Sequence, residues 1–158
     1  MAMTYLPLGA ASCLFLGVMV HAMITDVRHR QIMNQAVLVL ALGYLPMALI
    51  CGLAASEMLM GLAMALVVFA AGFACFCAGW MGGGDVKLGA ATALWLGAGQ
   101  VPAFLLLSAI LGAVLCIGIL AYRRWRSPVE HRPGIPYGPA LVVAAVVLFP
   151  SSPWFAAV

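Results

Sequence analysis

Charged residues are scarce in this sequence. Only 7% of its 158 residues are charged, whereas about 25% is usual for a soluble domain, and 66% are hydrophobic. The mean hydropathy is +1.18. These values exclude an ordinary water-soluble domain, and the length favours a single transmembrane domain over residues 1–158. We therefore predict an all-α integral membrane protein that packs against the lipid bilayer.

The sequence also lacks the patterns that hold metal ions or disulfides. Its five cysteines lie within or beside hydrophobic blocks, and none forms a Cys-x-x-Cys pair or accompanies a histidine cluster. We therefore expect no metal and no cofactor, and interpret the cysteines as small packing residues. The net charge of +3 comes from a few basic residues in particular loops, so we expect no nucleic-acid partner.

Hydrophobic stretches divide the chain into candidate helices. A helix that crosses a membrane needs about 20 mainly apolar residues. The fourth stretch is shorter and rich in Gly and Ala, so it either crosses as a short helix or turns back. The predicted helices cover approximately residues 4–25, 34–51, 57–80, 86–98, 102–122 and 137–155.

The basic residues predict the orientation of these helices. With six crossings and the N-terminus outside, the cytoplasmic loops cover residues 26–34, 80–87 and 123–136, which together hold every Lys and Arg. If the fourth helix turned back, the arginines that follow the fifth helix would lie outside. The charges therefore favour six transmembrane helices with a short fourth one. These basic residues are Arg28, Arg30, Lys87, Arg123, Arg124, Arg126 and Arg132.

Two acidic residues lie beside helices on the predicted cytoplasmic side. Asp26 follows the first helix, and Asp85 precedes the fourth. A carboxylate at the bilayer centre costs about 2.5–3.5 kcal/mol, so a pair on one face indicates a shared function. Two close carboxyls do not both ionise easily, so one can hold a proton while the other activates water. The pair therefore predicts peptide hydrolysis, although the sequence leaves open whether the carboxyls are close and which is protonated.

A run of glycines precedes Asp85. Gly82, Gly83 and Gly84 would permit positive φ angles and a close approach of substrate. They would also leave backbone N–H and C=O groups able to pair with an extended peptide. Simpler interpretations stay open: Asp26 as a charge at a helix end, the glycines as an interhelix turn, and Asp85 as an N-cap.

The residues around both aspartates resemble motifs of the type IV prepilin peptidase family. Residues 82–85 fit the Gly-x-Gly-Asp motif of intramembrane-type aspartic peptidases, and residues 81–91 as a whole resemble the prepilin peptidases. Asp-Val-Arg at 26–28, with Ile-Met-Asn at 32–34, resembles the family's Asp-x-Arg…Ile-Pro-Asn pattern, with Met in place of Pro. Ile-Pro-Tyr-Gly-Pro-Ala at 135–140 resembles its last-helix signature.

The resemblance implies a bacterial inner-membrane aspartic endopeptidase whose active site faces the cytoplasm. Its substrates would be prepilin and pseudopilin precursors, from which it removes a short basic leader. Asp26 and Asp85 would be catalytic. Residues expected to bind substrate or place its backbone are Gly82, Gly83, Gly84, Lys87, Pro136, Tyr137 and Gly138.

The resemblance also bears on a second activity. Large members of the family N-methylate the new N-terminus and carry a cytoplasmic insert with Cys-x-x-Cys pairs. This chain has a short first loop and no such pairs. We therefore expect peptidase activity without methyltransferase activity, similar to the small members that serve tight-adherence (Flp-type) pili. The sequence leaves the oligomeric state open.

Other interpretations stay open beside this one. A small transporter or channel would also use membrane carboxylates and broken helices, although the aspartates here lie at helix ends and no repeat is visible. A non-catalytic assembly factor of a pilus or secretion apparatus is a third possibility. Three roles stay open for Lys87: positioning Asp85, binding a lipid phosphate, or acting only as a charge that sets the topology. Glu130 is a candidate partner for the basic leader.

Overall fold

The computed structural model describes residues 2–125 and 135–156. Every regular element within these ranges is helical, which confirms the predicted all-α class. The elements are α1 (Ala2–His29), α2 (Asn34–Ile50), α3 (Ala55–Cys77), α4 (Gly83–Leu96), α5 (Val101–Trp125), α6 (Gly138–Leu148), the 3-10 turn η1 (Phe149–Ser151) and α7 (Pro153–Ala156).

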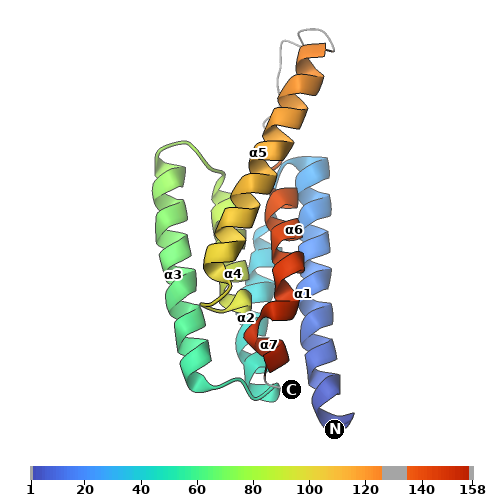
Figure 1. Ribbon diagram of the computed structural model, residues 1–158, viewed down its shortest axis with the longest axis vertical. Coiled ribbons are helices and arrows are strands. Elements are labelled where there is room, and N and C mark those ends of the chain that lie inside the picture. The colour runs from blue at the N-terminus through green and yellow to red at the C-terminus, as the bar shows by residue number, and fades with distance from the viewer. Residues whose placement is uncertain (1, 126–134, 157–158) are drawn as a thin grey trace.

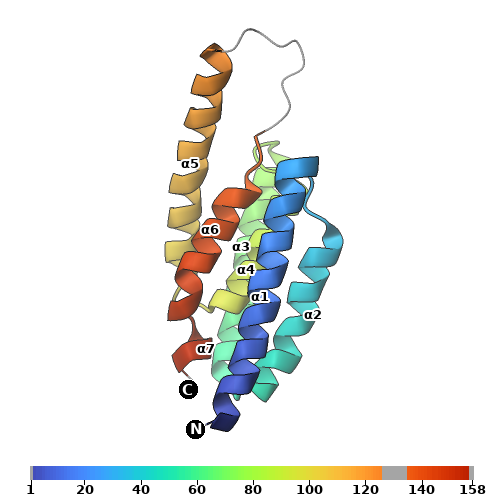
Figure 2. The same cartoon turned by 90° about the vertical axis from the view of Figure 1, so that its right-hand side faces the viewer.

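Consecutive helices from α1 to α6 run in opposite directions along one long bundle (Figure 1). The second view confirms this alternation and shows the upper part of α5 standing away from the other helices (Figure 2). Because of this order, the C-terminal end of α1 and the N-terminal end of α4 lie at the same end of the bundle. That arrangement brings the two aspartate motifs together although they are far apart in the sequence.

Helix α4 lies inside the bundle and contacts α2, α3, α5 and α6. All of its residues from Leu88 to Leu96 are buried. Small residues explain how α3 approaches it so closely, because small side chains let helix backbones pack tightly in membranes. A methyl group on Gly72 of α3 would lie 2.9 Å from the Val86 side chain, and one on Gly61 would lie 3.2 Å from the Leu94 carbonyl oxygen.

Four helical segments are long and apolar enough to cross a membrane: Leu6–His29, Ala55–Cys77, Val101–Trp125 and Gly138–Phe155. Large hydrophobic side chains cover the outer surfaces of α2, α3 and α5. The chain therefore has the character of a membrane protein. Helix α4 has 14 residues, or about 21 Å at 1.5 Å per residue, against a hydrocarbon core of about 30 Å. The six-crossing topology stays a prediction.

Aromatic residues fix the C-terminal end of α4. The buried Trp95 ring stacks on Trp154 of α7 at 4.8 Å between centroids and contacts Phe15 of α1 at 5.5 Å. The Trp95 indole N–H donates to the Leu40 carbonyl of α2 at 2.9 Å, and the Trp154 indole N–H donates to the Trp95 carbonyl at 2.7 Å. These contacts anchor α4 along the bundle axis and so set the depth of Asp85 at its other end.

Several helix ends differ from the sequence prediction. Helix α4 begins at Gly83, so Asp85 lies inside it and not before it. Helix α1 continues to His29, so Asp26 lies in its last turns and not after it. The last helix ends at Leu148, and the chain then forms η1 and α7, so a single helix to residue 155 was wrong. Pro150 explains the break, because a proline inside a helix lacks the N–H that the backbone ladder needs and clashes with the preceding turn.

Candidate active site

Asp26 is a buried carboxyl held by the start of the last helix. Only 5% of the residue is exposed. The backbone N–H of Gly138 donates a hydrogen bond to Asp26 Oδ2 at 2.8 Å. Gly138 is the first residue of α6, where N–H groups have no partner within the helix and the helix dipole favours a negative charge. A methyl group on Gly138 would lie 2.6 Å from the same oxygen, so only glycine fits there.

The chain turns sharply at Arg30, one helical turn after Asp26. The N–H of Arg30 donates to the Asp26 carbonyl at 2.9 Å, and Arg30 adopts a left-handed conformation with φ 56°. Such a residue ends a helix and redirects the chain. The following connection runs back over the first turn of α4, where a methyl group on Gly84 would lie 3.1 Å from Ile32 Cβ. The close approach of the two aspartate motifs therefore depends on Gly84.

Asp85 is the third residue of α4 and Gly82 is the N-cap, so Asp85 is not the N-cap residue. The Asp85 carboxylate folds back over Gly82, whose backbone hydrogen-bonds it. A methyl group on Gly82 would lie 2.8 Å from Asp85 Oδ2. Gly83 and Gly84 belong to the first helical turn. These three positions therefore need glycine because a side chain would crowd its neighbours.

The backbone angles correct one expectation about that run. Gly82 has φ −73° and ψ 140°, an extended conformation that most residues adopt. The predicted positive φ angles at residues 82–84 were wrong. Among the described glycines, positive φ angles occur elsewhere, at Gly52, Gly79 and Gly97.

Asp26 and Asp85 line the same cavity of about 280 Å³. Its other walls are the turn after α1, with Arg30 and Gln31, and the glycine run. The two carboxyls also interact electrostatically. The structure thus brings together the two aspartates that the sequence paired. Two carboxyls in one space can share a proton, which is the arrangement needed for acid/base work on a water molecule.

Lys87 joins the two motifs. Its ammonium Nζ donates to Asn34 Oδ1 at 3.0 Å, at the start of α2. The hydrogen bond therefore ties the first turns of α4 and α2 together, next to the contact of Gly84 with Ile32. Lys87 does not line the cavity that Asp26 and Asp85 share.

Tyr137 approaches Asp85 from the other side. Its hydroxyl donates to the Ser108 carbonyl of α5 at 2.9 Å. Its ring lies directly on Gly112, where any added side chain would collide with it. Pro136, just before Tyr137, is half-buried.

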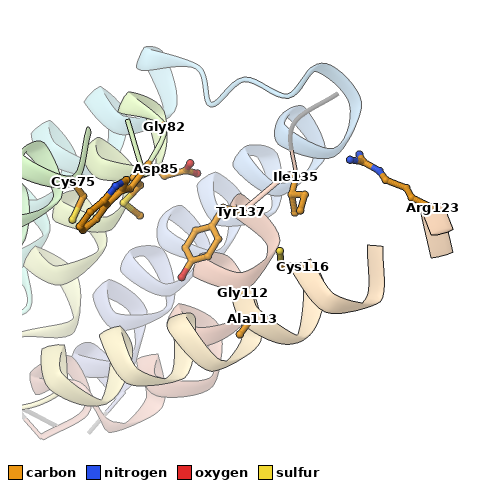
Figure 3. A pocket seen from close by; sticks show the side chains of 11 residues that line it. Cys75, Gly82, Asp85, Gly112, Ala113, Cys116, Arg123, Ile135 and Tyr137 are labelled. Carbon is orange, nitrogen blue, oxygen red and sulfur yellow. The ribbon is translucent and has the colours of Figure 1, made fainter. Parts of the chain in front are cut away.

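A larger cavity of about 770 Å³ reaches Asp85 between α3 and α5. Figure 3 shows Asp85 and Cys75 on one side of it, Gly112, Ala113 and Cys116 of α5 on the other, and Tyr137 between them. We call it the α3–α5 cavity. A volume of this size is typical of ligand pockets, which range from about 300 to 1,000 Å³.

Comparison with known proteins identifies the family. A sequence model of the type IV leader peptidase family matches residues 13–117, which include both aspartates. The chain belongs to this family. It is similar to a prepilin leader peptidase/N-methyltransferase of Aeromonas salmonicida (strain A449), with 44% identity over 64 residues, covering 40% of this chain and 21% of the relative. A protein of the same description from Aeromonas hydrophila matches with the same identity and coverage.

The chain spans only about a fifth of the length of these leader peptidase relatives in the matched region. No solved structure matches it. The family match ends at residue 117, before the segment that contains Tyr137 and Gly138. The structure nevertheless places Gly138 directly on Asp26, so the candidate site extends beyond the matched residues.

Some site residues were missed at the sequence level. Ser108 and Gly112 of α5 receive Tyr137, and the available signal was two small residues one helical turn apart. Asn34 was noted as part of a motif but not as the partner of Lys87. Glu130 lies outside the described residues. Within residues 2–125 and 135–156, no group of three His, Cys, Asp or Glu side chains could hold a metal ion.

Proposed function

We propose that this protein is a membrane aspartic endopeptidase that removes the short basic leader from prepilin and pseudopilin precursors. The observation that carries the proposal is that Asp26 and Asp85 line one cavity at one end of the bundle, in a chain of the leader peptidase family. No cofactor takes part in this chemistry.

The proposed reaction needs one protonated and one ionised carboxyl. The ionised carboxyl takes a proton from a water molecule, and the oxygen of that water attacks the peptide carbonyl carbon. At the same time the protonated carboxyl donates its proton to the peptide carbonyl oxygen. The tetrahedral intermediate then collapses, the C–N bond breaks, and a carboxyl returns a proton to the leaving amine. The hydrogen bond from Gly138 orients the Asp26 carboxyl during both steps. The shared cavity leaves room for the water and the peptide bond.

We further propose six crossings of the bacterial inner membrane, with the N-terminus outside and the active site facing the cytoplasm. The alternating helices support this, because they place Arg28, Arg30 and Lys87 at the same end as Asp26 and Asp85, and basic residues favour the cytoplasmic side. Because α4 is short, Asp85 would then lie deeper in the membrane than the ends of the neighbouring helices. Residues 1–158 would form one peptidase domain.

The substrate range and the second activity are also part of the proposal. We propose that the protein processes Flp-type pilins and lacks N-methyltransferase activity, since residues 30–33 form only a short connection between α1 and α2 and the sequence holds no Cys-x-x-Cys pair.

The decisive experiment is co-expression with an Flp-type prepilin and a gel assay of leader removal. Asp26→Asn and Asp85→Asn should each abolish processing while the protein still inserts into the membrane. Glu57→Gln is the matched control, because Glu57 lies in the first turn of α3 at the opposite end of the bundle. Normal processing by either aspartate variant would reject the acid/base pair and favour a transporter, a channel or a non-catalytic assembly factor. Mass spectrometry of the new N-terminus tests for methylation.

A further inference from the structure

The apolar part of α5 reaches further along the bundle than the aspartates do. From Val101 to Tyr122 the helix carries no charged side chain, and Arg123 and Arg124 follow in its last turn. This uncharged part is about 33 Å long at 1.5 Å per residue, which matches a hydrocarbon core of about 30 Å. Because basic residues favour the cytoplasmic headgroups, Arg123 and Arg124 indicate the level of the membrane surface beside α5.

The aspartates lie well below that level. The Tyr137 ring lies on Gly112 of α5, and the next residue, Gly138, donates its hydrogen bond to Asp26. Gly112 is therefore level with the site. From Gly112 to Arg123 the helix rises by about 16 Å. The carboxyls thus lie beside the middle of the apolar part of α5.

The neighbouring helices end much closer to the site. Helix α1 continues from Asp26 only to His29, a rise of about 5 Å. Helix α3 meets the first turns of α4 where Gly72 contacts Val86, and it ends at Cys77, about 8 Å further along. Both views show that the upper part of α5, residues 117–125, stands beyond these ends and away from the other helices (Figures 1 and 2).

This upper part of α5 has apolar side chains on several faces. Ile117, Leu120, Tyr122 and Trp125 are all exposed. Clustered apolar side chains are not stable in water, so the segment needs an apolar environment. Lipid fits best, because the segment continues a membrane-crossing helix, its charges come only at the end, and Tyr and Trp favour the membrane interface.

We propose that the lipid bilayer covers the upper part of α5, so that the cytoplasmic leaflet slopes down from Arg123 to Asp26 and Asp85. The inference rests on the proposed orientation of the helices. Helices of unequal apolar reach deform the bilayer around them. The α3–α5 cavity follows the slope, with Asp85 toward one end and Arg123 toward the other (Figure 3). Water fills this cavity and reaches the carboxyls from the cytoplasm without crossing hydrocarbon.

Spin labels test the slope directly. Ile117→Cys and Val27→Cys place labels at exposed positions, on the upper part of α5 and beside Asp26. The native cysteines are replaced by alanine, and the protein is placed in vesicles of phosphatidylethanolamine and phosphatidylglycerol. Collisions with oxygen report hydrocarbon, and collisions with a nickel chelate report water. We expect the ratio of oxygen to nickel collisions to be at least threefold higher for Ile117→Cys, although this position lies further along the bundle.

Leu66→Cys supplies the reference for hydrocarbon, because Leu66 is exposed near the middle of α3. A label at position 117 that collides with nickel as often as the label at position 27 would overturn the inference, because the leaflet would then be level. A label at position 117 that neither reagent reaches would also overturn it, because a protein partner would then cover α5.

A second measurement keeps the native cysteines. Trp125 is 90% exposed, so phospholipids with brominated acyl chains should quench its fluorescence. Trp125→Phe should therefore lower the fraction of tryptophan emission that these lipids quench. If it lowered only the fraction quenched by aqueous iodide, α5 would end in water and the inference would fail. Reaction of Val27→Cys with an impermeant maleimide from the outer side alone would instead reject the proposed orientation.

Discussion

Gly138 and Asp26 are 112 residues apart in the sequence and are joined by a hydrogen bond of 2.8 Å from the Gly138 N–H to Asp26 Oδ2. The last helix of the bundle thereby holds a carboxyl that belongs to the first. The bond satisfies an N–H at the start of α6 that no helical carbonyl can reach, and it fixes one face of the carboxyl. Position 138 therefore controls the geometry of Asp26 without supplying any side chain.

Gly138→Ala should consequently impair leader cleavage. The added methyl would lie 2.6 Å from Asp26 Oδ2, so the carboxyl or α6 has to move and the hydrogen bond is lost. Hydrogen bonds to charged groups are worth about 1.5–3 kcal/mol, so we expect kcat/KM to fall about 10- to 100-fold. The measurement is the initial rate of prepilin cleavage by the purified protein in proteoliposomes.

Gly118→Ala serves as its control. Gly118 lies within α5, and nothing lies within 4 Å of a methyl group placed there. This variant should cleave at the normal rate, because the methyl group meets no neighbour and alanine has a higher helix propensity than glycine. A Gly138→Ala protein with unchanged kcat/KM would show that the bond to Asp26 has no part in catalysis.

Tyr137→Phe tests the next residue along the chain. The change removes the hydroxyl that donates to the Ser108 carbonyl and keeps the ring on Gly112. The loss should cost about 0.5–1.5 kcal/mol of stability. Because Tyr137 precedes Gly138, we expect a severalfold lower cleavage rate as well. Gly112→Ala should have a larger effect, since it displaces the ring itself. Thermal unfolding in detergent and the cleavage assay should rank the variants in this order, and the reverse ranking would contradict it.

The pairing of Asp26 and Asp85 was predictable, whereas the contact with Gly138 was not. Basic loops and alternating helices are enough to place two acidic residues at one end of a bundle, because each crossing reverses the direction of the chain. A backbone N–H has no sequence signal, so nothing in the pattern at 135–140 indicated that Gly138 would donate to Asp26. Pairing of this kind depends on how α6 packs on α1, which only the three-dimensional arrangement shows.

The glycine run shows a different reason for error. Three consecutive glycines suggest an unusual backbone, because glycine alone adopts positive φ without strain. Here the glycines are needed for space: Gly82 receives the Asp85 carboxylate, and Gly84 receives Ile32. Both explanations give the same sequence, so composition does not separate them. Pro150, in contrast, was a readable signal for the end of α6, which the length of the hydrophobic stretch obscured.

Lys87 and Asn34 should behave as a coupled pair. Their hydrogen bond of 3.0 Å joins α4 to α2 beside the cavity that Asp26 and Asp85 line. If the bond positions the two motifs, Lys87→Met and Asn34→Ala should each lower the cleavage rate, and the double variant should be no worse than the poorer single one. Gln35→Ala, at the exposed next position of α2, is the control and should add independently to Lys87→Met. Fully additive losses for Lys87 and Asn34 would show that the bond does not matter.

The pH dependence of cleavage tests whether the two carboxyls act as one unit. At low pH both carboxyls are protonated, so neither can accept a proton from water. At high pH both are ionised, so neither can donate to the peptide carbonyl. Activity should therefore rise and then fall with increasing pH, and the two limbs belong to the pair and not to single residues. The profile of kcat/KM, measured in proteoliposomes with both faces buffered at the same pH, should show both limbs. A profile with only one limb across the range in which the protein stays folded would mean that Asp26 and Asp85 do not share the acid and base roles, although they line one cavity.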